Sequence, residues 1–205
     1  MRGKPRVATN VPDLAELEHF ASDSRTLIEP VYRTYVERVS SPAWAVSLET
    51  ACVLYALCMI ARPRAILDLG SGFSSVTFRL YARACTTGCV IRSVDDNPQW
   101  LNRTRVFLAS LGLSTEGLME WSEFRRKKSY YELIFHDLGD MPLRAASLEF
   151  ILGLRADTGW VILDDMHKGN YAPFAETVCA AAGLQLYPLR DLTLDRYGRF
   201  ACLCG

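Results

Sequence analysis

The most informative segment of this 205-residue chain is RAILDLGSGFSSV, residues 64–76. Its apolar beginning is typical of a strand buried in a parallel sheet. Gly70 and Gly72 follow, and because glycine lacks a Cβ they let the backbone turn sharply and pass close to a ligand. Ser74 or Ser75 can then cap a helix whose free N–H groups face the same ligand. The stretch therefore predicts a strand, a glycine loop and a helix, a unit that commonly cradles nucleotide-like molecules.

The bulk composition indicates one folded domain with balanced charge. Half of the residues are hydrophobic and 22% are charged, so the chain can bury a sizeable core. Lys+Arg and Asp+Glu both number 23, and no long-range field therefore favours nucleic acid or a membrane as a partner. We predict a single domain over residues 1–205 that acts on a small molecule.

The N-terminus and the cysteines bear on the compartment. The first residues lack the apolar core of a signal peptide, and the longest apolar run, residues 51–61, is too short to span a bilayer. The seven cysteines are an odd number and include no C-x-x-C pair, which gives no support for a zinc site. Reduced, mostly buried thiols fit this pattern better, and we therefore predict a cytoplasmic protein.

Strand-like and helix-like segments alternate through the middle of the chain. The strand-like segments are 64–69, 89–95, about 116–119, 131–137 and 159–165. The helix-like segments are 74–85, 98–111, 142–155 and 170–182. Such alternation predicts a Rossmann-like α/β fold, in which helices cover both faces of a mostly parallel sheet.

Both ends depart from the alternation. Two amphipathic patterns precede residue 40, with Pro30 in the first turn of the second, and a buried helix ends before Pro63. We therefore expect residues 1–62 to form a helical cap or lid, through which two copies could pair as a homodimer, and residues 63–205 to form the core. At the other end, residues 183–192 and 199–205 are strand-like with no helix between them. They predict an antiparallel hairpin that completes a seven-stranded sheet.

One candidate for the glycine loop's ligand is a dinucleotide. That ligand favours G-x-G-x-x-G after a strand, but Ser75 stands in the third glycine's place. The chain also ends in a hairpin, without a second half of the sheet. An NAD-type oxidoreductase stays an alternative, as does a non-catalytic binding protein.

A second interpretation of the glycine loop accounts for more residues. ILDLGSGFSSV, followed by IRSVDDNPQWL, resembles the class I S-adenosylmethionine-dependent methyltransferases. The resemblance implies cofactor binding by Asp68, Gly70, Ser71, Gly72, Ser75, Asp95 and Asp96. In that assignment the loop passes under the methionine part of the cofactor, and Asp95 holds both ribose hydroxyls, as a carboxylate can. The structural alternative is that Asp95 caps the helix that begins at Pro98.

Titratable groups gather after the fourth and fifth predicted strands, in FHDLGD and ILDDMHK. These segments resemble the metal-dependent catechol and caffeoyl-CoA type O-methyltransferases. The resemblance implies that Asp137, Asp164 and Asp165 bind Mg²⁺ or another divalent cation, although Asp165 stands where that branch has Asn. Carboxylates suit such a hard cation, which would hold a substrate hydroxyl and lower its pKa. The alternative is that Asp137 and Asp164 only shape the cofactor pocket.

Two residues are candidates for the general base. That branch has a lysine three places after its first metal ligand, where this chain has Asp140. His167 or Lys168 could serve with Asp137 in catalysis, and His167 is the better base near neutral pH, unless it caps a helix. The signature of amino-group methylation is absent, which favours oxygen as the acceptor. Aromatic residues that could line the substrate pocket are Tyr32, Tyr35, Trp44, Trp100, Trp121 and Tyr171.

Overall fold

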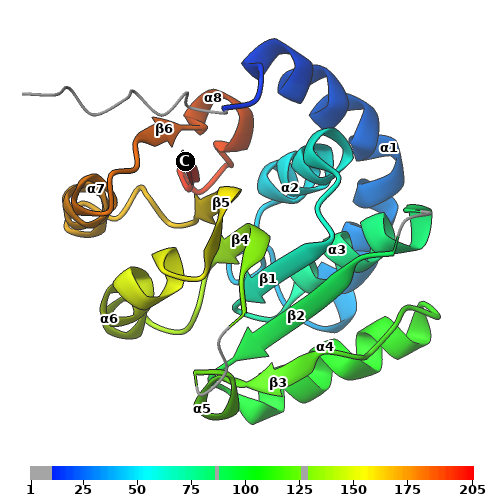
Figure 1. The fold of residues 1–205 in the computed structure, drawn as a ribbon. Coiled ribbons are helices and arrows are strands. Elements are labelled where there is room, and N and C mark those ends of the chain that lie inside the picture. Colours follow the sequence, from blue (N-terminus) through cyan, green and yellow to red (C-terminus); the bar gives the residue numbers. More distant parts are fainter. Residues whose placement is uncertain (1–10, 86–87, 126–128) are drawn as a thin grey trace, which may run out of the picture.

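A computed structural model describes residues 11–85, 88–125 and 129–205. One seven-stranded sheet runs through it in the order β3-β2-β1-β4-β5-β7-β6 (Figure 1). The strands are β1 (Ala65–Leu69), β2 (Val90–Asp95), β3 (Leu118–Glu120), β4 (Tyr131–His136), β5 (Arg155–Leu163), β6 (Leu186–Pro188) and β7 (Cys202–Cys204). From β3 to β5 in this order the neighbouring strands pair in parallel, and β7 pairs antiparallel with both β5 and β6. The predicted Rossmann-like fold with antiparallel C-terminal strands is confirmed.

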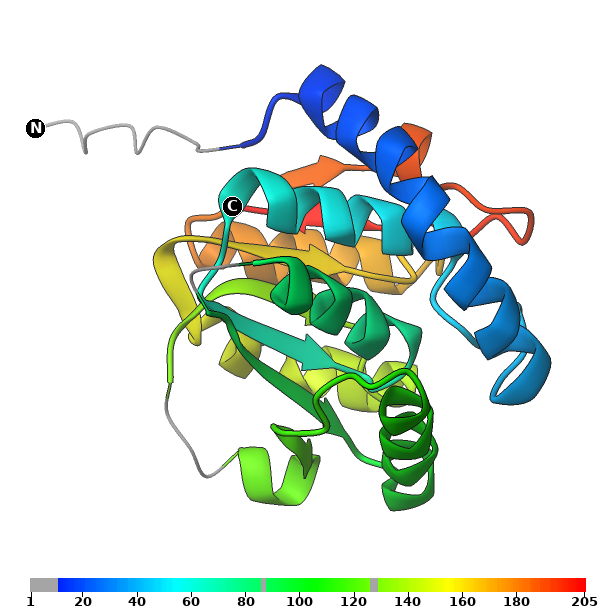
Figure 2. The same ribbon diagram turned by 90° about the vertical axis from the view of Figure 1, so that its right-hand side faces the viewer.

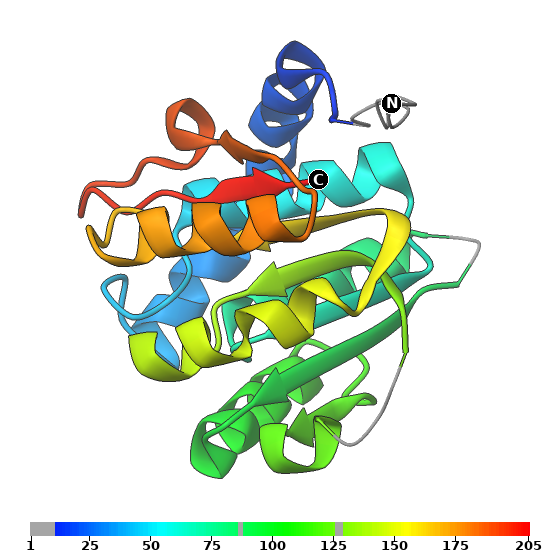
Figure 3. The same ribbon diagram turned by 60° about the vertical axis from the view of Figure 1, so that its left-hand side comes forward.

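Helices cover both faces of this sheet. They are α1 (Leu14–Arg38), α2 (Leu48–Ala61), α3 (Phe73–Ala84), α4 (Pro98–Ser110), α5 (Trp121–Phe124), α6 (Met141–Leu152), α7 (Tyr171–Ala181) and α8 (Arg190–Thr193). Helices α6 and α7 lie on one face, which Figure 3 brings forward, and α2 and α3 lie on the other (Figure 2). Among the described residues, no helix is both long and apolar enough to cross a lipid bilayer.

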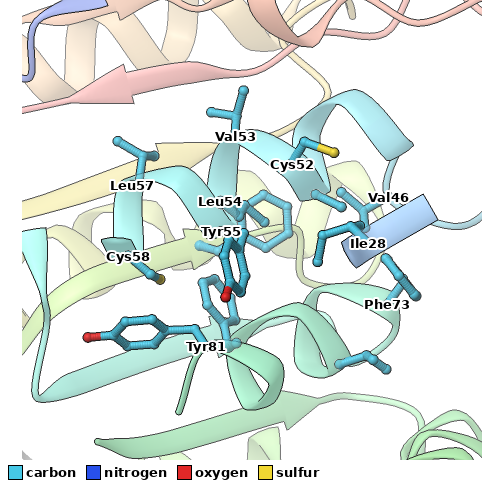
Figure 4. Packing of buried hydrophobic residues seen from close by; sticks show 14 of the residues in the cluster. Ile28, Val46, Cys52, Val53, Leu54, Tyr55, Leu57, Cys58, Phe73 and Tyr81 are labelled. Atoms are coloured by element: carbon cyan, nitrogen blue, oxygen red, sulfur yellow. The ribbon is translucent and has the colours of Figure 1, made fainter. Parts of the chain in front are cut away.

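Alternate strand residues fill two apolar clusters, one on each face, as the period of a strand requires. In β4, Leu133 and Phe135 join the cluster under α2 and α3, whereas Ile134 joins the cluster under α6 and α7. Figure 4 shows the first cluster, to which α2 contributes Leu54 and α3 contributes Phe73. Residues of α1 and α2 thus share one core with the sheet.

The N-terminal segment differs from the expected pair of helices. It forms one continuous helix, α1, with Pro30 inside it and exposed. Proline removes a helix hydrogen bond, but Leu17, Ile28 and Tyr35 on the buried face are fully shielded from water. Tertiary packing of that face therefore carries the helix past Pro30.

The C-terminal segment also differs, because the short helix α8 lies between β6 and β7 where no helix was predicted. A buried polar contact fixes it: the Thr193 hydroxyl donates to the Leu189 carbonyl at 2.7 Å and accepts from Ala201 N–H at 3.0 Å. Elsewhere α6 ends at Leu152, and β5 already begins at Arg155. The predicted boundaries at 155 and 159 were therefore wrong by three to four residues.

Candidate active site

A cavity of about 1130 Å³ opens at the carboxyl ends of the parallel strands, where ligands bind in such sheets. The glycine loop after β1 and residues 95–97 after β2 form one side, and the ends of β4 and β5 form the other. Residues 39–41 and 43–46, between α1 and α2, also line the cavity. The part of the predicted cap that faces the cavity is therefore this connection, together with Tyr35 at the end of α1.

The glycine loop is pressed against the end of β4. Gly70 has a φ of +93°, and a Cβ there would lie 2.2 Å from the Asp137 carbonyl oxygen. The Gly70 N–H donates to Val94 at 2.8 Å, and the Asp137 N–H donates to Leu69 at 2.7 Å. Only glycine fits this position, and the loop consequently ties the β1, β2 and β4 ends into one rim.

Two of the predicted cofactor residues lie beneath the loop instead of facing the cavity. Asp68 is fully buried, and its Oδ2 accepts from the Ser75 and Ser93 hydroxyls at 2.5 and 2.7 Å. Burial raises the pKa of Asp68, and the serine hydroxyls oppose that rise. Neither Asp68 nor Ser75 lines the cavity, and both support the loop from below.

Asp95 lies at the junction between the loop and the cavity. Its Oδ2 accepts from both the N–H and the hydroxyl of Ser71, at 2.7 and 2.8 Å, and its Oδ1 accepts from Asn97 N–H at 2.9 Å. Burial raises the pKa of Asp95 to about 6. The carboxylate also lines the cavity, beside Asp96. Asn97, not Asp95, caps α4, which corrects the structural alternative for Asp95.

Of the predicted cofactor residues, five line the cavity: Gly70, Ser71, Gly72, Asp95 and Asp96. Tyr35 adds a hydroxyl that is buried and has no hydrogen-bond partner among the described residues. A Cβ on Gly72 would lie 3.3 Å from that oxygen, so the hydroxyl sits directly against the loop. The indole N–H of Trp100 donates to the Ser71 carbonyl from the other side.

Arg144 of α6 organises the opposite rim. Its Nη2 lies 2.6 Å from Asp137 Oδ1, and its Nη1 lies 2.9 Å from Asp165 Oδ2. Burial lowers the pKa of this guanidinium, but the nearby carboxylates more than offset the effect. The sequence prediction missed Arg144, because an arginine on a helix usually reaches solvent and nothing in its spacing marks it as buried.

Asp164 and Asp165 follow the end of β5 in different environments. Asp164 is buried, and its Oδ1 accepts from the Asp165 N–H at 2.8 Å. Burial and the neighbouring Asp165 charge raise the pKa of Asp164. Burial also raises the pKa of Asp165, but Lys168 and Arg144 outweigh it and bring that pKa below its usual value. Asp165 has a φ of +61°, a left-handed conformation that Asp and Asn tolerate better than most residues.

The predicted metal ligands do not fit a divalent cation. Among the described residues, no group of three or more His, Cys, Asp or Glu side chains is arranged to hold a metal ion. The Arg144 guanidinium instead lies between two of the three predicted ligands, Asp137 and Asp165. One oxygen of Asp137 and one of Asp165 are therefore held by the guanidinium, whose positive charge opposes a metal cation beside them.

Both candidate bases line the cavity next to Asp165. His167 Nδ1 lies 3.5 Å from Asp165 Oδ1, and the Lys168 ammonium donates to Oδ2 at 2.7 Å. His167 caps no helix, since α7 begins after Asn170. Asp140, which replaces the expected lysine, caps α6 by accepting from Leu143 N–H at 2.9 Å.

Three of the predicted aromatic residues and one histidine lie away from the cavity. His136 is fully buried, with Nε2 3.0 Å from the Ser147 hydroxyl, and burial lowers its pKa to about 3. The imidazole is therefore neutral and structural. Tyr35, Trp44 and Trp100 line the cavity, whereas Tyr32, Trp121 and Tyr171 do not.

Solved structures resemble this fold over nearly its whole length. The SAH-bound methyltransferase PaMTH1 from Podospora anserina covers 97% of this chain and 98% of its own, at 13% identity and a TM-score of 0.66. An O-methyltransferase from Bacillus cereus in complex with SAH covers 92% and 98%, at 17% identity and a TM-score of 0.65. A Staphylococcus aureus protein assigned as a caffeoyl-CoA O-methyltransferase covers 94% and 99%, at 16% identity and a TM-score of 0.62.

The sequence itself matches no protein-family model and no curated protein. The sheet order, the antiparallel C-terminal strands and the structural likeness nevertheless define the class: this is the class I methyltransferase fold. Its structural neighbours are mostly S-adenosylmethionine-dependent O-methyltransferases.

Proposed function

We propose that this protein is an S-adenosylmethionine-dependent methyltransferase that methylates an oxygen atom of a small molecule. The observation that carries the proposal is the pairing of the Gly70–Gly72 loop with the Asp95 carboxylate at one cavity wall. The two glycines let the loop turn tightly at the cavity wall, and an adjacent carboxylate can accept two hydroxyls. The likeness to structures solved with SAH supports the same cofactor.

The two walls of the cavity would have different roles, one in binding the cofactor and the other in placing the acceptor. Asp95 would accept the two ribose hydroxyls, because each of its oxygens can accept more than the bonds it already makes within the protein. The loop and Tyr35 would border the methionine part, and the connection between α1 and α2, which also lines the cavity, would exclude water. The bound cofactor supplies a methyl group already activated on a sulfonium, so the protein's task is mainly alignment.

We propose His167 as the general base. The imidazole would accept the proton that the acceptor hydroxyl loses when its oxygen is methylated. Asp165, 3.5 Å from Nδ1, would orient the ring. Lys168 is the second candidate, but its ammonium is already held by Asp165 at 2.7 Å.

Oxygen is favoured as the acceptor on two grounds. The amino-group signature is absent after β4, where DLGD stands, and the structural neighbours are mostly O-methyltransferases. The NAD alternative has less support because Ser75 replaces the third glycine and lies beneath the loop.

Calorimetric titration with SAH tests the cofactor assignment. We expect micromolar binding by the wild type and at least a roughly hundredfold loss in Asp95→Ala, as removal of a charge-assisted pair implies. Asp157→Asn, at an exposed position of β5, should bind like the wild type. Absence of SAH binding by folded wild-type protein would refute the proposal, and binding of NAD in its place would support the oxidoreductase.

A further inference from the structure

The acceptor side of the cavity already contains a fixed cation. The Arg144 side chain is only 5% exposed, although it lines the cavity. Besides Asp137 and Asp165, it donates to the Gly139 carbonyl at 3.2 Å and reaches the Leu138 carbonyl at 3.5 Å. The guanidinium is thus held by groups from the end of β4 and the end of β5 together.

This arrangement disfavours a metal at the same carboxylates. A divalent cation needs oxygens at about 2.0–2.6 Å, and one oxygen of Asp137 and one of Asp165 already lie against guanidinium N–H groups. Arginine also stays protonated in proteins, so its positive charge opposes a cation beside these two carboxylates. A metal there would avoid this repulsion only if the Arg144 side chain left a buried position with several partners.

We propose that the Arg144 guanidinium takes the place of the divalent cation, so that the acceptor site works without a bound metal. The inference rests on the proposed function, because it concerns the acceptor half of that same cavity. Arg144 acts as a positioning residue: it offsets part of the negative charge of Asp137 and Asp165, fixes their orientation and keeps positive charge beside the acceptor oxygen.

The sequence carries two matching departures. Asp165 stands where the resembling branch has Asn, and Asp140 stands where it has a lysine. The additional carboxylate of Asp165 is the one that receives both Arg144 and Lys168. Asp140 meanwhile is used as a helix cap. Arg144 and Lys168 therefore surround Asp165 at the rim where the resembling branch has a metal and a lysine.

The test is a Mn²⁺ titration of the full-length protein followed by electron paramagnetic resonance, with and without SAH. We expect no saturable binding by the wild type up to about 1 mM Mn²⁺, a concentration at or above the dissociation constants of built carboxylate sites. Arg144→Gln should gain a saturable site with a dissociation constant at least about tenfold below that 1 mM limit, because Asp137 and Asp165 lose their competing cation. Arg33→Gln removes the same charge from an exposed helix surface and should behave like the wild type.

Saturable Mn²⁺ binding by the wild type that disappears in Asp165→Asn would overturn the inference. So would an Arg144→Gln protein that folds, by its circular dichroism spectrum, but binds no more Mn²⁺ than the wild type. If Arg144→Gln does not fold, the wild-type titration alone decides. SAH binding is measured calorimetrically on the same samples, so a failure of the cofactor proposal is seen separately from the metal result.

Discussion

The two walls of the cavity are built in different ways. The wall that we propose to bind the cofactor, called the cofactor wall, depends on backbone: Gly70 passes so close to Asp137 that no side chain fits, and Ser71 donates its N–H and its hydroxyl to Asp95. The wall that we propose to face the acceptor, called the acceptor wall, depends on side-chain charge, with Arg144 between Asp137 and Asp165. Backbone demands leave glycines in the sequence that can be recognised, whereas a charge network leaves only ordinary Asp and Arg residues.

The largest expected effect is on the acceptor wall. Arg144→Met should lower the free energy of unfolding by about 3–5 kcal/mol, because removing one partner of a buried ion pair leaves uncompensated charge. Urea unfolding followed by circular dichroism measures the change. Arg33→Met, on the exposed side of α1, should stay near the wild-type value. An equally stable Arg144→Met protein would contradict a charge network on this wall.

Gly70→Ala tests the cofactor wall. We expect a loss of about 2–4 kcal/mol in unfolding free energy and loss of SAH binding, because the new Cβ combines a positive φ with a clash on Asp137. Gly183→Ala is the matched control, since Gly183 has a φ of +76° but a Cβ added there would meet no atom within 4 Å. The control should lose only about 1 kcal/mol and keep its SAH affinity. Equal losses of unfolding free energy in both variants would show that the close approach of Gly70 to Asp137 does not affect stability.

The pH dependence of SAH binding tests the proposed role of Asp95. Burial raises its pKa to about 6, so the carboxylate is ionised at pH 7.5 and about nine-tenths protonated at pH 5. A neutral carboxyl accepts hydroxyls more weakly, and we expect about tenfold weaker SAH binding at pH 5. Calorimetry across that range measures it. Asp95→Asn should lack this component, and an unchanged wild-type affinity would argue against ribose binding by Asp95.

The smallest expected effect is at Tyr35. Its hydroxyl is buried without a hydrogen-bond partner among the described residues, so Tyr35→Phe should stabilise the free protein by about 1 kcal/mol. If the hydroxyl instead serves the cofactor, the same variant should bind SAH more weakly. Thermal melts with and without SAH measure both changes. A variant with higher melting temperature and unaltered SAH affinity would assign Tyr35 to packing alone.

Local chemistry and periodicity in the sequence predicted the parallel strands, and they placed Gly70, Gly72 and Asp95 at strand ends, where the fold creates the cavity. They carry no information on contacts between distant residues. Asp68 was predicted to bind the cofactor, and the structure places its carboxylate under the loop, where it accepts from Ser93 of the next strand.

The order of the strands, the glycine loop and the positions of the acidic residues at strand ends could be predicted from the sequence alone, because these follow from backbone sterics and the period of burial. Only the tertiary structure decided that Pro30 stays within α1, that α8 separates the last two strands, and that Arg144 is buried between Asp137 and Asp165. Each of these depends on the free energy of contacts between residues far apart in the chain, and no local pattern reports that free energy.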